Sequence, residues 1–242
     1  MIETLTVLLA GHLAGDFLLQ TDAMVRRKRE LPFLGWHAAI VTLVTALFCG
    51  SMQPLLLVAV FLLHLLIDLI KTHGLGDELR GFLLDQALHL LSLLAIASLF
   101  PSALADGFWP LLAGPESLPP YLAAVTLLNG LVLCLPFGAL LVEKATASFM
   151  ADLTDQGKGL PEGGRTIGLL ERFLVFVFTF LGEFAAVGFL LTAKSILRFG
   201  EIRNSADRKA TEYIIIGTFL SIGWALTIAL GTRGLWHFWF GG

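Results

Sequence analysis

The chain has 242 residues, of which 56% are hydrophobic and 14% are charged, and its mean hydropathy is +0.82. A soluble domain of this length could not bury so much apolar surface, so the composition predicts an integral membrane protein. The net charge of −3 argues against nucleic acid as a partner and leaves the lipid bilayer as the expected surroundings.

Apolar segments recur along the whole chain. A membrane span needs roughly 20 predominantly apolar residues. In chain order, the sequence predicts spans at residues 3–20, 35–50, 53–70, 81–100, 121–142 and 213–231. The expected fold is all-α, a polytopic transmembrane helical bundle of six or seven spans. The count depends on residues 168–199, an apolar segment that charged residues interrupt.

Four parts are expected along the chain. Residues 1–100 form a four-helix membrane bundle, and residues 101–142 form an outer loop and the fifth span. Residues 143–167 form a polar cytoplasmic loop, and residues 168–242 form the C-terminal membrane segments. This last part carries a basic rim, which either binds lipid phosphates or anchors the chain as positive charges ordinarily do. The residues of this rim are Arg172, Lys194 and Arg198.

The basic residues also predict the orientation. The connections after the first, third and fifth spans contain Lys and Arg, and those after the second and fourth contain none. Positive charges stay in the cytoplasm, so we expect an outer N-terminus in a bacterial inner membrane. A single crossing by residues 168–199 would place five positive charges outside. A hairpin or an interfacial segment is therefore favoured, with Gly182 and Gly188 as bends.

Histidines and aspartates recur inside the first four spans. Three spans carry one of each at four-residue spacing, which places both on one helix face. A further histidine opens the second span. These seven residues, which we name the His/Asp cluster, are His12, Asp16, His37, His64, Asp68, Asp85 and His89. All fall within a layer roughly 15 Å deep at the basic ends of the spans. Ionisable groups in lipid cost several kcal/mol unless they are paired or bound.

Imidazole and carboxylate groups together suit a divalent metal ion, Zn or Mn above all. The predicted ligands are His12, His64, Asp68 and His89. Asp16 and Asp85 would be further ligands, would orient the ligands or would act as a general base. His37 would be a ligand or would polarise the substrate. A metal ion with an open position can activate water, so the leading hypothesis is a metal-dependent hydrolase. Its substrate is either lipid-linked or cytosolic.

Other interpretations use the same residues. Each pair can be a hydrogen bond between packed helices, and the whole set can be a proton or ion path of a transporter. A transporter should show polar residues that continue to the outer leaflet, and spans two to five show few there. A membrane scaffold that binds another protein through residues 143–165 is a third alternative. The oligomeric state is left open.

The segments GHLAGDFLLQ, GWHAAI, HLLIDLIK and FLLDQALH carry a resemblance. With them the chain resembles a bacterial integral-membrane family, domain of unknown function 3307. The C-terminal segments GRTIGLLERF, GFLLTAKSILRF and EYIIIGTFLS resemble the longer members of that family. The resemblance implies a membrane protein and no particular activity. The His and Asp pairs are also similar in style to membrane-bound metal-dependent hydrolases, in residue types and spacing.

Overall fold

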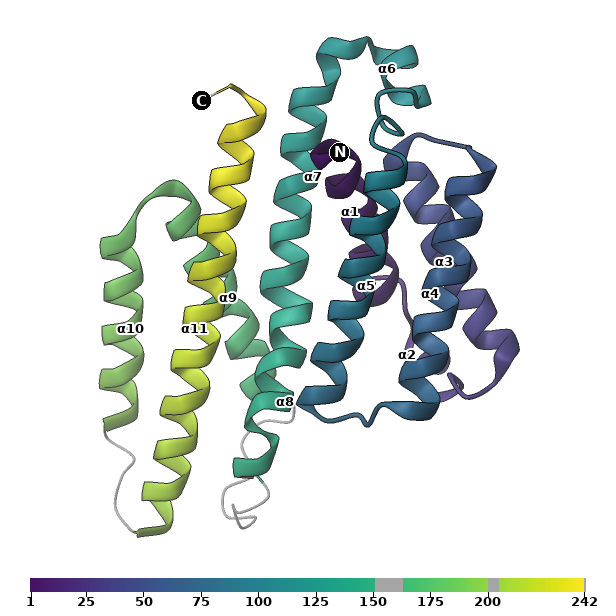
Figure 1. The fold of residues 1–242 in the computed structure, drawn as a ribbon. Coiled ribbons are helices and arrows are strands. Elements are labelled where there is room, and N and C mark those ends of the chain that lie inside the picture. The colour runs from purple at the N-terminus through teal and green to yellow at the C-terminus, as the bar shows by residue number, and fades with distance from the viewer. Residues whose placement is uncertain (151–162, 200–204, 242) are drawn as a thin grey trace. The chain divides into compact units, whose positions relative to one another are not determined.

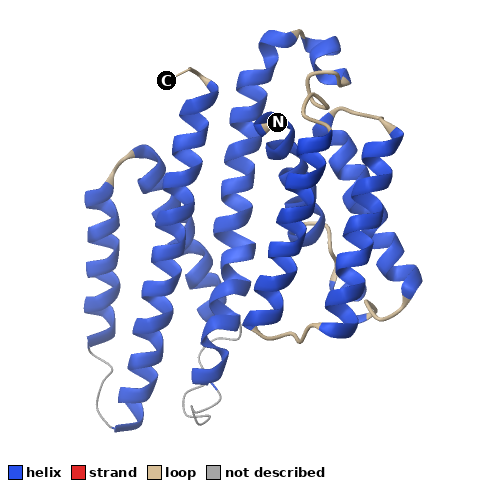
Figure 2. Cartoon of the chain, viewed as in Figure 1, coloured by secondary structure: helices blue, strands red, loops and turns tan. Residues whose placement is uncertain are grey.

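The computed structural model describes residues 1–150, 163–199 and 205–241, which form helices joined by loops and turns (Figures 1 and 2). The helices are α1 (Ile2–Phe17), α2 (Asp22–Arg26), α3 (Leu31–Cys49), α4 (Pro54–Gly74), α5 (Leu79–Leu99), α6 (Phe108–Ala113), α7 (Leu118–Val132), α8 (Gly138–Met150), α9 (Gly163–Leu181), α10 (Phe184–Phe199) and α11 (Ser205–Trp239). A 3₁₀ turn at Pro115–Ser117 precedes α7, and a π-helical turn at Leu133–Phe137, which contains Pro136, joins α7 to α8.

The prediction of an all-α membrane bundle is confirmed. Among the described residues, 5 helices are long and apolar enough to cross a bilayer, and they cover Leu31–Cys49, Pro54–Gly74, Leu79–Leu99, Pro115–Ser148 and Ile214–Trp239. Their outward faces expose large apolar side chains such as Leu43, Leu62 and Leu91. Lipid covers such faces in a bilayer, so the chain is a multi-pass membrane protein.

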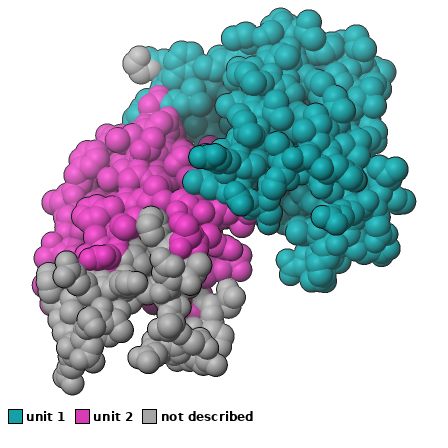
Figure 3. All heavy atoms as spheres, turned by 60° about the horizontal axis from the view of Figure 1, so that its bottom comes forward, with its two compact units in different colours: residues 1–129, 235–242 teal, residues 130–234 magenta. Residues whose placement is uncertain are grey.

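The chain divides into two compact units (Figure 3). Unit 1 contains residues 1–129 and 235–242, and unit 2 contains residues 130–234. The polar stretch 143–167 falls within unit 2. Its residues 143–150 belong to α8 and residues 163–167 to α9, whereas residues 151–162 lie outside the described part of the chain.

Four helices of unit 1 form a closed ring of neighbours. α1 packs against α3 and α5, and α4 packs against the same two helices (Figure 1). α1 has only 16 residues, about 24 Å of helix, and most of them are buried. Because protein rather than lipid surrounds it, α1 is not required to match the length and hydropathy of a lipid-facing span. The first span was predicted at residues 3–20, and the observed helix ends three residues earlier, at Phe17.

Two glycines let α1 approach α3 closely. A Cβ atom on Gly11 would lie 2.5 Å from the Cα of Thr45, and one on Gly15 would lie 2.5 Å from Cγ2 of Val41. Their spacing is the Gly-x-x-x-Gly pattern, which membrane helices use to bring their backbones together. This contact sets the distance between the His12 and Asp16 face of α1 and the first turns of α3.

The outer half of unit 1 is an apolar core. Val7 and Leu8 from α1, Leu56 from α4 and Ile96 from α5 are at most 1% exposed and pack in one cluster. The side of the His/Asp cluster on which α1 and α4 begin and α3 and α5 end is thus filled with hydrocarbon side chains. Some of the few polar groups there bond to backbone; for example, Nδ2 of Asn129 donates to the carbonyl oxygen of Thr6 at 3.0 Å.

Unit 2 contains a helical hairpin in the segment 168–199. α9 and α10 pack together, and Gly182 turns the chain between them with φ +87°. Gly182 is thus a bend, as predicted, whereas Gly188 lies inside α10 and bends nothing. The hairpin agrees with the favoured interpretation of this segment.

The prediction of a basic rim on these helices is wrong for Arg172. Arg172 is only 3% exposed, and its Nη1 donates to Oγ of Ser221 at 3.1 Å. Lys194 is paired with Glu171, with 2.6 Å between Nζ and Oε2. Burial inside unit 2 withdraws Arg172 from any rim, and the side chain of Arg198 lies outside the described residues. Sequence position alone could not show which helix face α9 buries.

Candidate functional site

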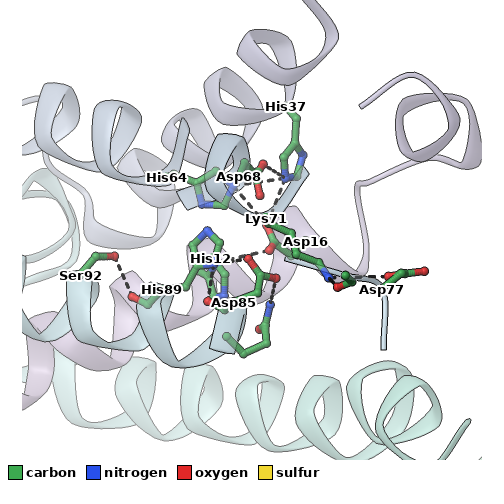
Figure 4. Close-up of polar contacts among 12 residues, drawn as sticks. His12, Asp16, His37, His64, Asp68, Lys71, Asp77, Asp85, His89 and Ser92 are labelled. Atoms are coloured by element: carbon green, nitrogen blue, oxygen red, sulfur yellow. Dashed lines mark hydrogen bonds and ion pairs between the residues drawn. The ribbon is translucent and has the colours of Figure 1, made fainter. Parts of the chain in front are cut away.

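All seven residues of the His/Asp cluster gather at one end of the unit 1 ring. They come from α1, α3, α4 and α5, and their imidazoles and carboxylates point toward one another (Figure 4). The four histidines, Asp68 and Asp85 are between 1 and 7% exposed. The side chains of Asp16 and Asp85 are each 11% exposed, so these two carboxylates lie nearest to the surface. Such burial of ionisable groups requires compensation.

Helix geometry accounts for this gathering. The residues of each pair are four apart on a continuous helix, so both side chains project from one face. In α3, Pro32 stands in the first turn, where its missing N–H costs nothing, and His37 follows in the second turn. α1 contributes its last turns and α3 its second turn, whereas His64 of α4 and His89 of α5 lie in the middle of their helices.

The closest groups belong to α1, α3 and α4. Nε2 of His37 and Nε2 of His64 are 3.2 Å apart. Oδ1 of Asp16 lies 3.2 Å from the first of these nitrogens and 3.5 Å from the second. From α4, Oδ2 of Asp68 lies 3.6 Å from each nitrogen. Two imidazoles thus face each other, with a carboxylate oxygen against both from two different helices.

These distances fit ligands of a shared cation. Two ligand atoms bound at about 2.1 Å to one tetrahedral zinc ion lie about 3.4 Å apart. The five distances among the four atoms range from 3.2 to 3.6 Å. Asp16, His37 and His64 form one triangle of this size, and Asp68 forms a second triangle on the same two nitrogens. Three protein ligands with an open position are typical of catalytic metal sites.

The other two histidines lie beside this group. The rings of His12 and His89 stack with their centroids 4.7 Å apart, and the ring of His89 lies 4.6 Å from that of His64. Nδ1 of His12 is 3.7 Å from Oδ2 of Asp16, the second oxygen of that carboxylate. Ligand atoms of His12, His64 and His89 lie within 4.8 Å of one another, and so do those of Asp68, Asp85 and His89.

The tautomer of His89 follows from its backbone contact. Its Nδ1 is 3.0 Å from the carbonyl oxygen of Asp85, which can only accept, so this nitrogen carries the proton. When the ring is neutral, Nε2 keeps its lone pair. A backbone acceptor on one ring nitrogen is the usual arrangement of a histidine that binds metal through the other.

Several buried atoms of the cluster make no hydrogen bond within the described part of the chain. They are Nδ1 of His12, Oδ1 of Asp16, Nδ1 of His37, Oδ2 of Asp68, Oδ1 of Asp85 and Nε2 of His89. Buried polar atoms are nearly always satisfied in folded proteins, and six exceptions in one cluster need an explanation. Two of these atoms, on Asp16 and Asp68, belong to the triangles described above. A bound cation would satisfy them.

The residues that lie closest together in the structure are not the same set as the predicted metal ligands. His12, His64, Asp68 and His89 were the predicted ligands, whereas the shortest distances join Asp16, His37 and His64. All of these residues do lie together, and their roles stay predictions. Asp85 is held at the edge, where its Oδ2 accepts a hydrogen bond from Gln86 at 3.1 Å.

Sequence reasoning missed residues that shape the site. Gly11 and Gly15 set the approach of α1, and their four-residue spacing is a signal that could have revealed them. Lys28, half-buried between α2 and α3, interacts electrostatically with Asp68. Only the folded chain shows that contact.

Comparison with known proteins gives one match. Residues 4–107 match the family described as "Protein of unknown function (DUF3307)". No curated protein and no solved structure matches the chain. The matched region contains α1 to α5 and every residue of the His/Asp cluster. The match to the DUF3307 family of proteins of unknown function thus covers residues 4–107 of the 242-residue chain.

Proposed function

We propose that this protein is a metal-dependent hydrolase of the bacterial inner membrane. The observation that carries the proposal is the set of distances between 3.2 and 3.6 Å among Asp16, His37, His64 and Asp68. Nitrogen and oxygen donors at that spacing suit Zn²⁺ or Mn²⁺. A hydrogen-bonded packing motif would satisfy its buried atoms, whereas six atoms of this cluster have no hydrogen bond within the described residues.

Each residue then has a chemical role. Asp16, His37 and His64 would bind the ion from three helices. Asp68, 3.6 Å from both imidazoles, would complete the ligand set or take the proton of a metal-bound water. A metal ion lowers the pKa of its water toward neutrality, which supplies a hydroxide nucleophile for hydrolysis.

The surrounding groups would orient these ligands. His12 faces the second oxygen of Asp16, and Asp85 holds His89 through its backbone carbonyl oxygen. Partners of this kind typically contribute a factor of about 10 to 100 to metal affinity or activity.

The apolar core of unit 1 supports an enzyme over a transporter. Val7, Leu8, Leu56 and Ile96 fill the half of the ring beyond the cluster. A conduit would need polar groups or broken helices there. A site that is packed with apolar side chains on this side suits a reaction that takes its substrate from the other side.

The basic residues support a cytoplasmic position for the site. The residues of the loops at this end of the ring include Arg26, Lys28, Lys71 and Arg80. Positive charges of short loops stay in the cytoplasm, so the cluster would lie in the cytoplasmic leaflet of the inner membrane.

Removal and return of metal test this proposal. The purified protein in lipid nanodiscs should lose hydrolytic activity on aryl phosphate and aryl carboxylate esters after chelation, and recover it with Zn²⁺ or Mn²⁺. Asp68→Asn should lower the turnover number by about 100-fold, because a neutral amide takes up no proton. Gln86→Ala, a change at the edge of the cluster, serves as the control and should lower it far less. Activity that survives complete chelation would contradict the proposal.

A further inference from the structure

An apolar groove lies between the two helices that carry His37 and His64. Its volume is about 530 Å³, within the range of small-molecule sites. Its walls include Ala39, Leu43 and Ala46 from α3, and Leu57, Phe61 and Leu62 from α4. From Ala39 to Ala46 it follows the α3 axis for about 10 Å, a third of the hydrocarbon thickness of a bilayer.

The position of the groove defines the chemistry of what fills it. Leu43 and Leu62 are 70% and 56% exposed on the outward faces of two membrane spans. The medium against such faces is the hydrocarbon of lipid chains rather than water. The occupant is therefore a lipid chain, which van der Waals contact with the walls would hold in the groove.

The near end of the groove lies at almost the same depth as the His/Asp cluster. Ala39 follows His37 by two residues and Leu62 precedes His64 by two residues, so this end lies about 3 Å along the helix axes from the imidazoles, on the outward faces of the same two helices. One turn further, Gly35 continues the groove face of α3, and nothing lies within 4 Å of the position where its Cβ would be. A lipid in the groove would thus carry its head group past the start of α3, at the level of the cluster.

A basic segment precedes α3 in the chain, at the end of the helix that is nearer to the cluster. It contains Arg26, Arg27, Lys28 and Arg29. The Arg27 guanidinium forms two hydrogen bonds of 2.7 Å with Glu30, and they lower the pKa of this carboxyl group. Arg26 and Arg29 form no ion pair within the described part of the chain and are exposed, and Lys28 is near enough to interact electrostatically with Asp68. Positive charge beside a metal site favours an anionic head group.

We propose that the substrate is the phosphate ester of a membrane lipid, whose chain lies in the α3/α4 groove and whose phosphate lies between the His/Asp cluster and the basic segment. This inference rests on the proposed function and names its substrate class. The apolar groove lies on one side of the depth of His37 along α3, and the open space at Gly35 and the basic segment before α3 lie on the other side.

The reaction is a hydrolysis at phosphorus. The oxygen of a water molecule forms a bond to phosphorus, and the bond between phosphorus and the lipid alkoxy oxygen breaks. The electron pair of the broken bond stays on the alkoxy oxygen, which takes up one proton. The products are the lipid alcohol and inorganic phosphate, and water is the only co-reactant.

The test compares long-chain and water-soluble phosphate esters. The full chain in phosphatidylcholine nanodiscs, loaded with Zn²⁺ or Mn²⁺, is given dioleoyl phosphatidate or a polyisoprenyl phosphate. The soluble counterparts are glycerol 3-phosphate and isopentenyl phosphate, and phosphate release is measured. We expect kcat/KM to be at least about tenfold higher for one long-chain ester than for its counterpart.

Variants locate the effect. Ala39→Phe fills the groove and should lower kcat/KM for the long-chain ester by about tenfold, with hydrolysis of the soluble ester unchanged. Leu91→Phe enlarges a lipid-facing side chain of α5 outside the groove and should change neither. Lys28→Gln should raise KM for the long-chain phosphate by about tenfold without loss of metal.

Each outcome has one meaning. Equal rates on long-chain and soluble esters, or an Ala39→Phe variant that keeps its full rate on the long-chain ester, would overturn the lipid proposal and leave the metal hydrolase standing. Metal-dependent hydrolysis confined to carboxylate esters would do the same. A protein that binds no metal and hydrolyses none of these esters would overturn the proposed function itself.

Discussion

His64→Ala is expected to lower the affinity for Zn²⁺ or Mn²⁺ by about 100-fold or more and to abolish hydrolysis. Nε2 of His64, like Nε2 of His37, has three near neighbours in the cluster, since it lies 3.2 Å from Nε2 of His37, 3.5 Å from Oδ1 of Asp16 and 3.6 Å from Oδ2 of Asp68. Its loss removes a ligand and leaves both carboxylates without one of their two imidazole neighbours. Equilibrium dialysis followed by elemental analysis of the protein measures this change.

The same helix supplies the control for this variant. His73 lies in the last turn of α4, is exposed, and contacts only the carbonyl oxygen of Leu69 at 3.1 Å. His73→Ala should therefore bind as much metal as the unchanged protein. A His64→Ala protein that keeps full metal content would show that the cluster is a packing motif.

Gly11→Val is expected to destabilise unit 1 and to remove bound metal at the same time. The new Cβ would lie 2.5 Å from the Cα of Thr45, and a backbone atom cannot move aside as a flexible side chain can. Overpacking of this kind costs about 1–3 kcal/mol. The α1 helix must also shift away from α3, which carries Asp16 away from His37. Thermal unfolding in detergent and metal content of the same sample measure both effects.

Gly223→Val in α11 is the matched control, because nothing lies within 4 Å of the Cβ position there. It makes the same change in side chain inside another membrane helix. It should leave metal content unchanged and alter the unfolding temperature little. If Gly11→Val unfolds no earlier than this control, the close α1–α3 contact does not hold the site together.

The sequence predicted the spans well and the ligand pairing less well. Long apolar runs and the breaks at Pro32 and Pro54 locate α3 and α4 within a few residues of the observed bounds. The four-residue spacing of His12 with Asp16, and of His64 with Asp68, places these groups on common faces without any tertiary information. Those two signals were sufficient to predict a cluster at one depth.

Which cluster members face each other depends on helix rotation, which the sequence does not encode locally. His37 stands alone in α3, so its spacing indicated no partner, yet its Nε2 is the nearest nitrogen to His64. The rotation of α3 is set by its contact with Gly11 and Gly15 on a different helix. Arg172 shows the same limit in unit 2, where burial against Ser221 could not be deduced from a positive charge near a span end.

X-ray absorption spectroscopy of the zinc-loaded protein tests the central claim most directly, because it reports the atoms bound to the ion. We predict about one zinc per chain, with two histidine imidazoles and carboxylate oxygen at about 2.0–2.1 Å. In His37→Ala the imidazole contribution should fall to one. Zinc that fails to bind stoichiometrically, or a coordination shell that keeps both imidazoles in His37→Ala, would contradict the assignment of His37 and His64 as joint ligands.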